Sequence, residues 1–314
     1  MEVVRKNEFP MLLIVDEVHA LGSPVRRERI AGNFTFRMGL SATPTRYFDD
    51  EGTKVLFDYF GGVVYSLPLS KAISLGILVA YEYFPKIVEL TETEFLEYVK
   101  LTRKFASLAS SKDEELTELQ ERFLYERARL VEAASAKYQA LSDSLESIKT
   151  IDHCLIFGTE RQIDKINRIL DSKRIIHHNF TEMENLPERT ELLSRFSKGD
   201  YQTLVAIRCL DEGVDIPSAK QAIIMASSGN PRQFIQRRGR VLRTDSKSSK
   251  RKAQIWDFLV VANMRPKSSD DYFRLEQKIL ERQLKRVQEF SSTSLNPRYT
   301  TLAITDIKLA YRLS

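Results

Sequence analysis

The pattern of apolar and polar positions is most regular between residues 151 and 262. Apolar runs predict strands at 151–157, 174–178, 202–207, 221–227 and 253–261. Helices are predicted between these strands, because apolar residues recur at helical spacing in "ERQIDKINRIL", "LPERTELLSRFSKG" and "PRQFIQRRGRVLR". Gly199 is expected to be the C-cap of the second of these helices. Continuous apolar strands that alternate with helices predict an α/β fold with a doubly wound parallel sheet.

The first 90 residues repeat this pattern only in part. "MLLIV" at 11–15 predicts a buried strand, and "FRMGLSATP" at 36–44 predicts a second strand that ends in small residues. Further on, "FGGVVYSLPLSKAISLGIL" predicts a strand, a turn at Pro68 and a short helix. Because so little sequence precedes Met11, we expect the chain to begin inside an α/β domain.

Residues 92–147 differ in kind, since they contain neither glycine nor proline and are rich in Glu, Lys, Leu and Ala. Apolar residues recur there at helical spacing, and "ASSKDEE" at 109–115 interrupts them. We predict two long helices in an antiparallel hairpin, which is either a partly packed insert or an arm that grips nucleic acid. A last amphipathic helix is predicted at 268–290.

Composition narrows the class of protein without deciding it. The chain has 314 residues, and its 48 basic and 43 acidic residues give a net charge of +5, which is compatible with a polyanionic partner. Cys154 and Cys209 are isolated within apolar runs and are expected to be buried free thiols. No apolar run approaches the ~20 residues that span a bilayer, and we expect a cytoplasmic protein with no membrane partner.

Two carboxylates follow the strand predicted at 11–15. Burying an unpaired carboxylate is costly, so Asp16 and Glu17 are expected at the strand tip. Ligands of parallel α/β sheets bind at the carboxyl ends of the strands. One carboxylate there can hold Mg²⁺ and the other can activate a hydrolytic water, although a simple strand end that leads into a helix cap explains the pattern equally well.

A basic helix, "QRRGRVLR", forms the second candidate site. Arg240 and Arg243 are three residues apart and are predicted to share one helical face, where two guanidinium groups can bind phosphate oxygens. A solvated basic face is the alternative. Apolar residues on the same helix indicate that one side of it packs, which favours anion binding.

Taken in order, five segments resemble the motifs of superfamily 2 helicases and translocases. "VDEVH" resembles the DEAD/DEAH-like motif II, and "SATP" resembles motif III. "CLIFGTERQIDKI" resembles motif IV, "LDEGVDIP" resembles motif V, and "QFIQRRGRVLR" resembles motif VI. With "IWDFLV" after them, they look most similar to the XPB-type and restriction-subunit-like branch, which acts on DNA. The resemblance implies the end of a first RecA-like ATPase lobe at 1–68, a linker and helical hairpin insert at 69–150, a complete second RecA-like lobe at 151–265 and a helical extension at 266–314.

The resemblance also implies roles for individual residues. Asp16 would bind Mg²⁺ and Glu17 would activate water, while His19 would reach Gln236 across the cleft. Ser41 and Thr43 would couple hydrolysis to movement on nucleic acid. Gly213 and Asp215 would shape the nucleotide cleft, and Arg240 and Arg243 would act as arginine fingers on the γ-phosphate of ATP.

One expected motif is missing from the sequence. No G-x-x-x-x-G-K-[ST] phosphate-binding loop occurs in it. We therefore expect an ATP-dependent DNA helicase or translocase whose remaining first-lobe segment is supplied in cis or by a separate chain, with this chain alone inactive. The alternative is a nucleic-acid-binding or regulatory fragment, from a split or degenerate helicase gene, that does not hydrolyse ATP.

Overall fold

The computed structural model divides the chain into two compact units, residues 1–68 and 69–314. The described residues are 9–27, 30, 34–45, 49–108, 118–207, 216, 218–226, 231–245, 250–266 and 270–313.

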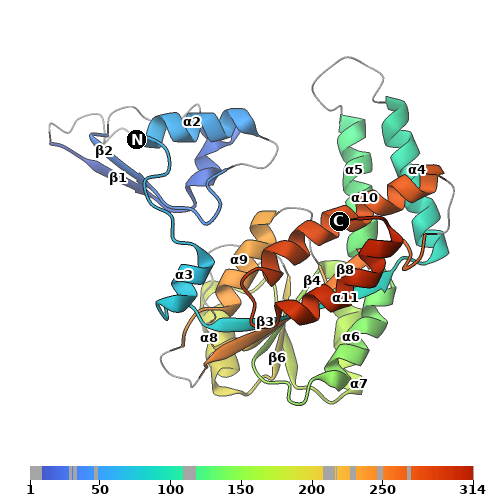
Figure 1. Cartoon of the computed structure of the whole chain (residues 1–314). Helices are drawn as coiled ribbons and strands as arrows, with labels where there is room; N and C mark the ends of the chain where they lie inside the picture. The colour runs from blue at the N-terminus through green and yellow to red at the C-terminus, as the bar shows by residue number, and fades with distance from the viewer. Residues whose placement is uncertain are drawn as a thin grey trace. The chain divides into compact units, whose positions relative to one another are not determined.

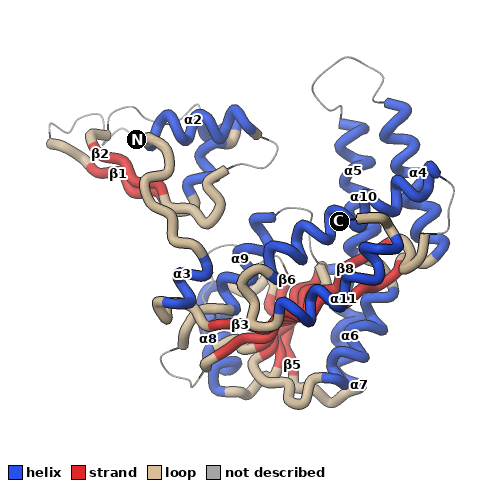
Figure 2. The backbone as a smooth tube through the Cα atoms, viewed as in Figure 1, coloured by secondary structure: helices blue, strands red, loops and turns tan. Residues whose placement is uncertain are grey.

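The first unit contains a two-stranded parallel sheet. Strand β1 (Leu12–Val15) pairs in register with β2 (Phe36–Gly39), and η2 (Val18–Gly22), α1 (Pro24–Arg27) and α2 (Asp50–Phe60) complete the unit (Figure 2). The prediction of a buried strand is wrong, since Leu12 of β1 is 54% exposed and Ile14 is 58% exposed. A two-stranded sheet packed by helices on one side leaves its apolar side chains uncovered on the other.

The second unit is built on a six-stranded sheet in the order β3-β8-β7-β4-β6-β5, and all of its described pairings are parallel (Figure 1). This confirms the predicted doubly wound α/β fold. Its strands are β3 (Ala80–Glu89), β4 (Cys154–Gly158), β5 (His177–Phe180), β6 (Thr203–Ile207), β7 (Gln221–Ile224) and β8 (Lys252–Val261).

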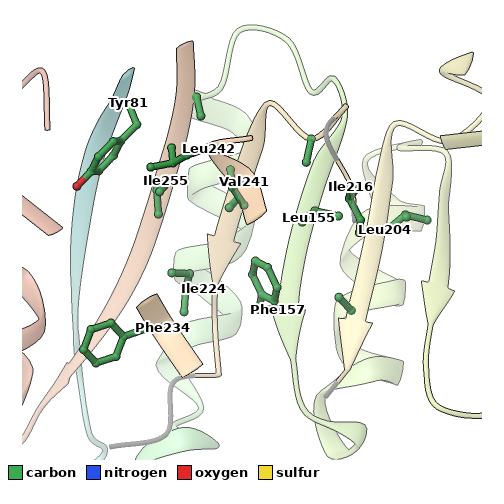
Figure 3. Close-up of a cluster of buried hydrophobic side chains, with 14 of the residues drawn as sticks. Tyr81, Leu155, Phe157, Leu204, Ile216, Ile224, Phe234, Val241, Leu242 and Ile255 are labelled. Atoms are coloured by element: carbon green, nitrogen blue, oxygen red, sulfur yellow. The ribbon is translucent and has the colours of Figure 1, made fainter. Parts of the chain in front are cut away.

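Alternating side chains of the central strands divide the core between two faces of the sheet. Leu155 and Phe157 of β4 face helices α8 (Leu186–Lys198), α9 (Pro231–Val241) and α10 (Asp270–Ser291), and Phe234 of α9 lies against this face (Figure 3). Cys154 and Ile156 face α6 (Ala136–Ser147) and α7 (Ile163–Ser172) on the other side. Burial of this kind, about 25 cal/mol per Å² of apolar surface, is the main force that holds the unit together.

The helical insert consists of three helices instead of the predicted two. Helices α4 (Glu92–Leu108) and α5 (Glu118–Glu132) form the hairpin, and the predicted break at 109–115 lies outside the described residues. After Glu132 the chain turns, and α6 joins the core of the sheet through Leu141 and Leu145. The second predicted helix is therefore split, because its last part packs on the sheet while α5 pairs with α4.

The linker region differs from its prediction. Residues 63–68 form no regular structure where a strand was expected, although the short helix is present as α3 (Leu69–Ser74). The strand follows instead as β3, in which Tyr81 and Tyr83 alternate into the core. Pro85 is tolerated because β3 is an edge strand of the sheet.

The remaining boundaries follow from local geometry. Gly199 closes α8 with a positive φ of 86°, as predicted. A positive φ of 57° at Arg174 precedes β5, which begins at His177, three residues later than predicted. After α10, which confirms the predicted last amphipathic helix, the structure adds α11 (Pro297–Ala310).

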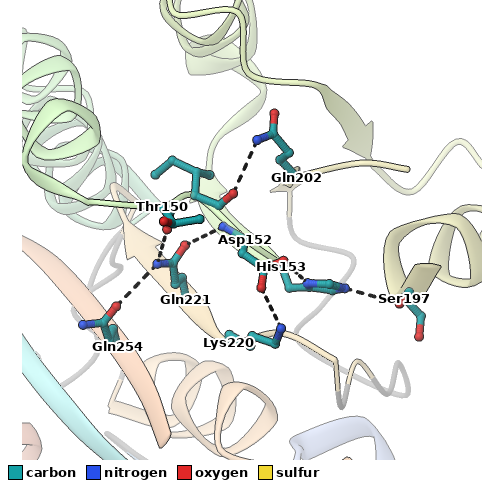
Figure 4. A network of polar contacts seen from close by, with 9 residues as sticks. Thr150, Asp152, His153, Ser197, Gln202, Lys220, Gln221 and Gln254 are labelled. Atoms are coloured by element: carbon teal, nitrogen blue, oxygen red, sulfur yellow. Dashed lines mark hydrogen bonds and ion pairs between the residues drawn. The ribbon is translucent and has the colours of Figure 1, made fainter. Parts of the chain in front are cut away.

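At the amino ends of the strands, a polar network ties the loops together (Figure 4). Lys220 Nζ lies 2.6 Å from Asp152 Oδ2, and His153 contacts both Asp152 and the carbonyl oxygen of Ser197. These partners lower the pKa of Asp152 against the opposing effect of burial, which is the largest single influence on it. The network joins the loops at the amino ends of the strands, opposite to the carboxyl ends at which parallel α/β sheets generally bind ligands.

Two sequence predictions concern single features. Cys154 is buried and free, and burial raises the pKa of its thiol, whereas Cys209 lies outside the described residues. Among the helices of the described chain, none has both the length and the apolar character that crossing a membrane requires.

Candidate active site

The two carboxylates of motif II lie directly after β1. Asp16 is exposed, and its Oδ1 accepts a hydrogen bond of 2.8 Å from the amide of Glu17. Glu17 has left-handed backbone geometry, with φ 49° and ψ 46°, which is uncommon outside glycine. The Val18 amide then donates to the Leu40 carbonyl after β2, at 2.9 Å. The turn therefore presents both carboxylates at the carboxyl ends of the parallel strands, as the sequence predicted.

His19 joins motif II to motif III. Its side chain is only 2% exposed, and Nδ1 lies 3.2 Å from Glu17 Oε2 and 3.3 Å from Ser41 Oγ. Ser41 Oγ in turn accepts a hydrogen bond of 3.1 Å from the Thr43 amide. The imidazole is thus held between the carboxylate and the "SATP" segment. Sequence reasoning directed His19 toward Gln236 and did not predict its contact with Ser41.

In the second unit, motif VI occupies α9. Gln236 is half-buried, and the two arginines that follow it are bound within the unit. Arg237 donates to the carbonyl oxygen of Ala226 and lies 5.2 Å from the ring centroid of Phe157. Arg238 donates to Glu289 Oε1 at 2.7 Å and to the Glu289 carbonyl at 3.0 Å. These contacts fix α9 against the sheet and against α10.

The end of α9 separates the two predicted arginine fingers. Arg240 is buried inside the helix, which ends at Val241, whereas Arg243 is exposed beyond it and pairs through its backbone with Leu78. The prediction that one helix carries both arginines is therefore wrong. The helix stops because the Leu242 carbonyl accepts a hydrogen bond of 2.8 Å from the Val79 amide, which draws the chain onto the linker.

A lysine caps the helix at this point. Lys250 Nζ donates to the carbonyl oxygens of Val241 and Arg243, at 2.8 Å each. A cation at a helix C-terminus is favoured both by the helix dipole and by the unpaired carbonyls there. The backbone that carries Arg243 is held in this way although it lies outside the helix.

The structure thus assembles the predicted residues in two groups. Asp16, Glu17, His19, Ser41 and Thr43 meet in the first unit, and Gln236, Arg240 and Arg243 follow one another in the second. Gly213 and Asp215 lie outside the described residues. Arg237 and Arg238 were missed as anchors of motif VI. Only their position beside apolar residues on an amphipathic helix indicated that they pack.

Comparison with protein families indicates the class of protein to which this chain is similar. Residues 136–245 match the family described as the helicase conserved C-terminal domain. This segment runs from α6 through motif VI and includes most of the parallel sheet. The match confirms the predicted resemblance to superfamily 2 helicases.

Individual proteins with similar sequences include DNA translocases and helicases of the XPB type. The chain is 30% identical over 266 residues to the DNA 3'-5' translocase XPB2 of Sulfurisphaera tokodaii, an alignment that covers 77% of this chain and 58% of the relative. It is 29% identical over 233 residues to the DNA 3'-5' helicase XPB of Kineococcus radiotolerans, covering 74% of this chain and 37% of that protein. The chain therefore spans about half the length of these relatives or less.

A solved structure supports the fold independently. A fragment described as an HsdR subunit of a type I restriction enzyme from Vibrio vulnificus has a TM-score of 0.51 and 22% sequence identity. The similarity covers 79% of this chain and 43% of the fragment. At this identity the likeness concerns the fold alone.

Proposed function

We propose that this chain is part of an ATP-dependent translocase or helicase that acts on duplex DNA. The observation that carries the proposal is the group formed by Glu17, His19 and Ser41 at the carboxyl ends of two parallel strands. The similarity to XPB-type DNA translocases supports it. Hydrolysis of ATP would drive movement of the two RecA-like lobes along the DNA backbone.

In this proposal Glu17 accepts the proton of the attacking water. A general base must be held in a fixed position, and the buried His19 imidazole, 3.2 Å from Glu17 Oε2, restricts the carboxylate. The Ser41 hydroxyl lies 3.3 Å from the same imidazole nitrogen. A change at the hydrolysis site can therefore pass through His19 to the "SATP" segment, where Ser41 and Thr43 would couple it to movement on DNA.

Asp16 would hold Mg²⁺, which neutralises phosphate charge when it is bound with ATP. The fit is good, because Mg²⁺ keeps several waters and needs few protein ligands, usually one or two carboxylates. Asp16 is exposed at the end of a parallel strand, and its backbone neighbour Glu17 holds one of its oxygens in place. This arrangement suits contact with the ion through water or directly.

The arginines of motif VI would act on the phosphates. We propose that Arg240 and Arg243 stabilise negative charge on the γ-phosphate in the transition state, an effect that arginine fingers elsewhere supply at 10³–10⁵-fold in rate. Gln236 would meet His19 of the other lobe. Gly213 and Asp215 would form the wall of the nucleotide cleft, as the resemblance implies.

The proposal requires a segment that carries the phosphate-binding loop. The uncovered face of the first unit supports such a partner, since Leu12, Ile14, Phe36 and Met38 of β1 and β2 are all at least 50% exposed. Parallel sheets are ordinarily covered on both faces. We propose that the remaining part of the first lobe, in cis or as a separate chain, covers this face.

Hydrolysis by the complete protein tests the proposal. We expect ATP turnover that duplex DNA stimulates, and we expect Glu17→Gln to abolish it while ATP still binds. Glu51→Gln is the matched control, because Glu51 is an exposed carboxylate of the same unit that pairs only at the surface with Arg27. Absence of DNA-stimulated turnover, or full activity of Glu17→Gln, would favour the non-hydrolysing alternative.

A further inference from the structure

Lys137 lies in the first turn of α6 and is only 1% exposed. Its Nζ donates to two backbone carbonyl oxygens, that of Glu132 at 2.9 Å and that of Met225 at 2.6 Å. Glu132 is the last residue of the hairpin helix α5, and Met225 directly follows β7. One side chain therefore joins the base of the hairpin to the carboxyl end of the sheet.

Both ends of this link continue into helicase motifs. The Glu132 carbonyl also accepts a hydrogen bond of 3.2 Å from Gln162 Nε2, in the motif IV segment. On the other side, the carbonyl of Ala226, next to Met225, accepts from Arg237 of motif VI. Consecutive carbonyls after β7 are thus held by a hairpin-side lysine and a motif VI arginine, both within the second unit.

The buried ammonium group of Lys137 contributes hydrogen bonds in addition to packing. The pKa of its ammonium is lowered to about 7, chiefly by desolvation and also by the charge of Arg286, while Glu132, Asp257 and Glu94 oppose the change. A methionine would occupy a similar volume without the cost of burying an amine. The two hydrogen bonds offset that cost, and their geometry spans two elements that are far apart in the sequence.

We propose that Lys137 is a positioning residue that couples the hairpin of α4 and α5 to motif VI. A displacement of α5 moves the Glu132 carbonyl, and Lys137 transmits the displacement to Met225, the residue beside the carbonyl that Arg237 holds. The orientation of α9, and with it Arg240, then depends on the state of the hairpin. This inference rests on the proposed function, because its consequence is a change in ATP hydrolysis.

A double-mutant cycle in the complete protein tests the coupling. Arg127→Met loosens the hairpin, because Arg127 donates to Thr102 Oγ1 at 3.3 Å and lies over the ring of Tyr98. Lys137→Met removes the proposed link. We expect each single variant to lower kcat about tenfold, within the range known for coupled networks, with KM for ATP changed less than about twofold.

The double variant is decisive. If Lys137 carries the coupling, Arg127→Met lowers kcat no further once Lys137 is methionine. Lys149→Met, the same change at an exposed lysine, should leave kcat unaltered. Multiplied losses in the double variant, or a normal kcat for Lys137→Met, would overturn the proposal and leave Lys137 a structural residue.

Amide hydrogen exchange provides a second test, which depends neither on hydrolysis nor on folding of the Lys137 variant. The amides of Met225 and Ala226 both donate to the Phe157 carbonyl, at 3.0 and 2.9 Å. In Arg127→Met, we expect exchange in the peptide that contains them to become several-fold faster than in the unaltered protein. Unchanged exchange there contradicts the coupling, whereas lost hydrolysis in every sample contradicts only the proposed function.

Discussion

The four arginines of motif VI illustrate how one residue type serves different purposes according to its surroundings. Arg237 and Arg238 are buried and donate to groups of their own unit, Ala226 and Glu289. Arg240 is buried one turn further on, and Arg243 is exposed beyond the helix. The first two arginines hold α9 in place, and we propose that Arg240 and Arg243 contact phosphate, as the resemblance to motif VI implies.

Replacing Arg240 tests that division of roles. In the complete protein, Arg240→Ala should lower kcat at least about 100-fold and change KM for ATP little, because an arginine finger acts on charge that develops in the transition state. Arg251→Ala, at an exposed arginine in the same unit, serves as the control. A raised KM with a normal kcat would reassign Arg240 to ground-state binding or to DNA contact.

At the residue scale, the sequence indicated which residues belong to the candidate site better than it indicated which residues contact one another. Asp16 and Glu17 were placed correctly at a strand tip, because charge cannot follow an apolar strand into a core without penalty. The contact of His19 with Ser41 spans 22 positions and depends on the parallel pairing of β1 with β2, which local patterns do not report. The buried Lys137 was likewise invisible, since it occurs in a stretch that reads as an ordinary amphipathic helix.

Among the elements, the hairpin of α4 and α5 is the candidate arm for binding DNA. Arg127, one of its basic residues, is buried between the two helices and lies over the rings of Tyr98 and Phe105. It holds the hairpin together. Arg103 and Lys104, near the end of α4, are exposed, and their cationic groups lie over the rings of Tyr272 and Phe123.

If the hairpin is a DNA-binding arm, charge reversal at Arg103 and Lys104 weakens binding. Replacing both with glutamate should raise the Kd for duplex DNA several-fold and flatten its dependence on salt, because fewer counterions are released. The same double change at Lys165 and Arg168, which are exposed on α7, is the control. Binding isotherms at two salt concentrations that coincide with those of the unaltered protein would return the hairpin to a structural role.

The elements that the sequence predicted well are those with a strong, uniform pattern. The central strands β4, β6, β7 and β8 are mostly apolar and were located within a few residues. Strand β3 was missed, because its polar alternation and Pro85 suit an edge position and weaken the strand signal. The division between α5 and α6 was missed because no glycine or proline marks the turn after Glu132.

For the molecule as a whole, we propose that the two units hold different parts of an ATP-dependent translocase or helicase. The first presents the motif II carboxylates, and the second presents motif VI beside the six-stranded parallel sheet. Neither contains the glycine-rich motif that cradles phosphate, since the sequence has no G-x-x-x-x-G-K-[ST]. Without the backbone amides and the lysine of such a loop, we expect the carboxylates and arginines to lack a bound substrate on which to act.

The ATPase rate of purified 1–314, measured alone and together with the remaining segment of the first lobe, tests this account most directly. The account predicts no turnover above background for the chain alone, even with duplex DNA, and DNA-stimulated turnover when the segment is present. That turnover should disappear in Glu17→Gln. Turnover by 1–314 alone that Glu17→Gln abolishes would contradict the account, because the chain would then contain a substitute phosphate-binding loop.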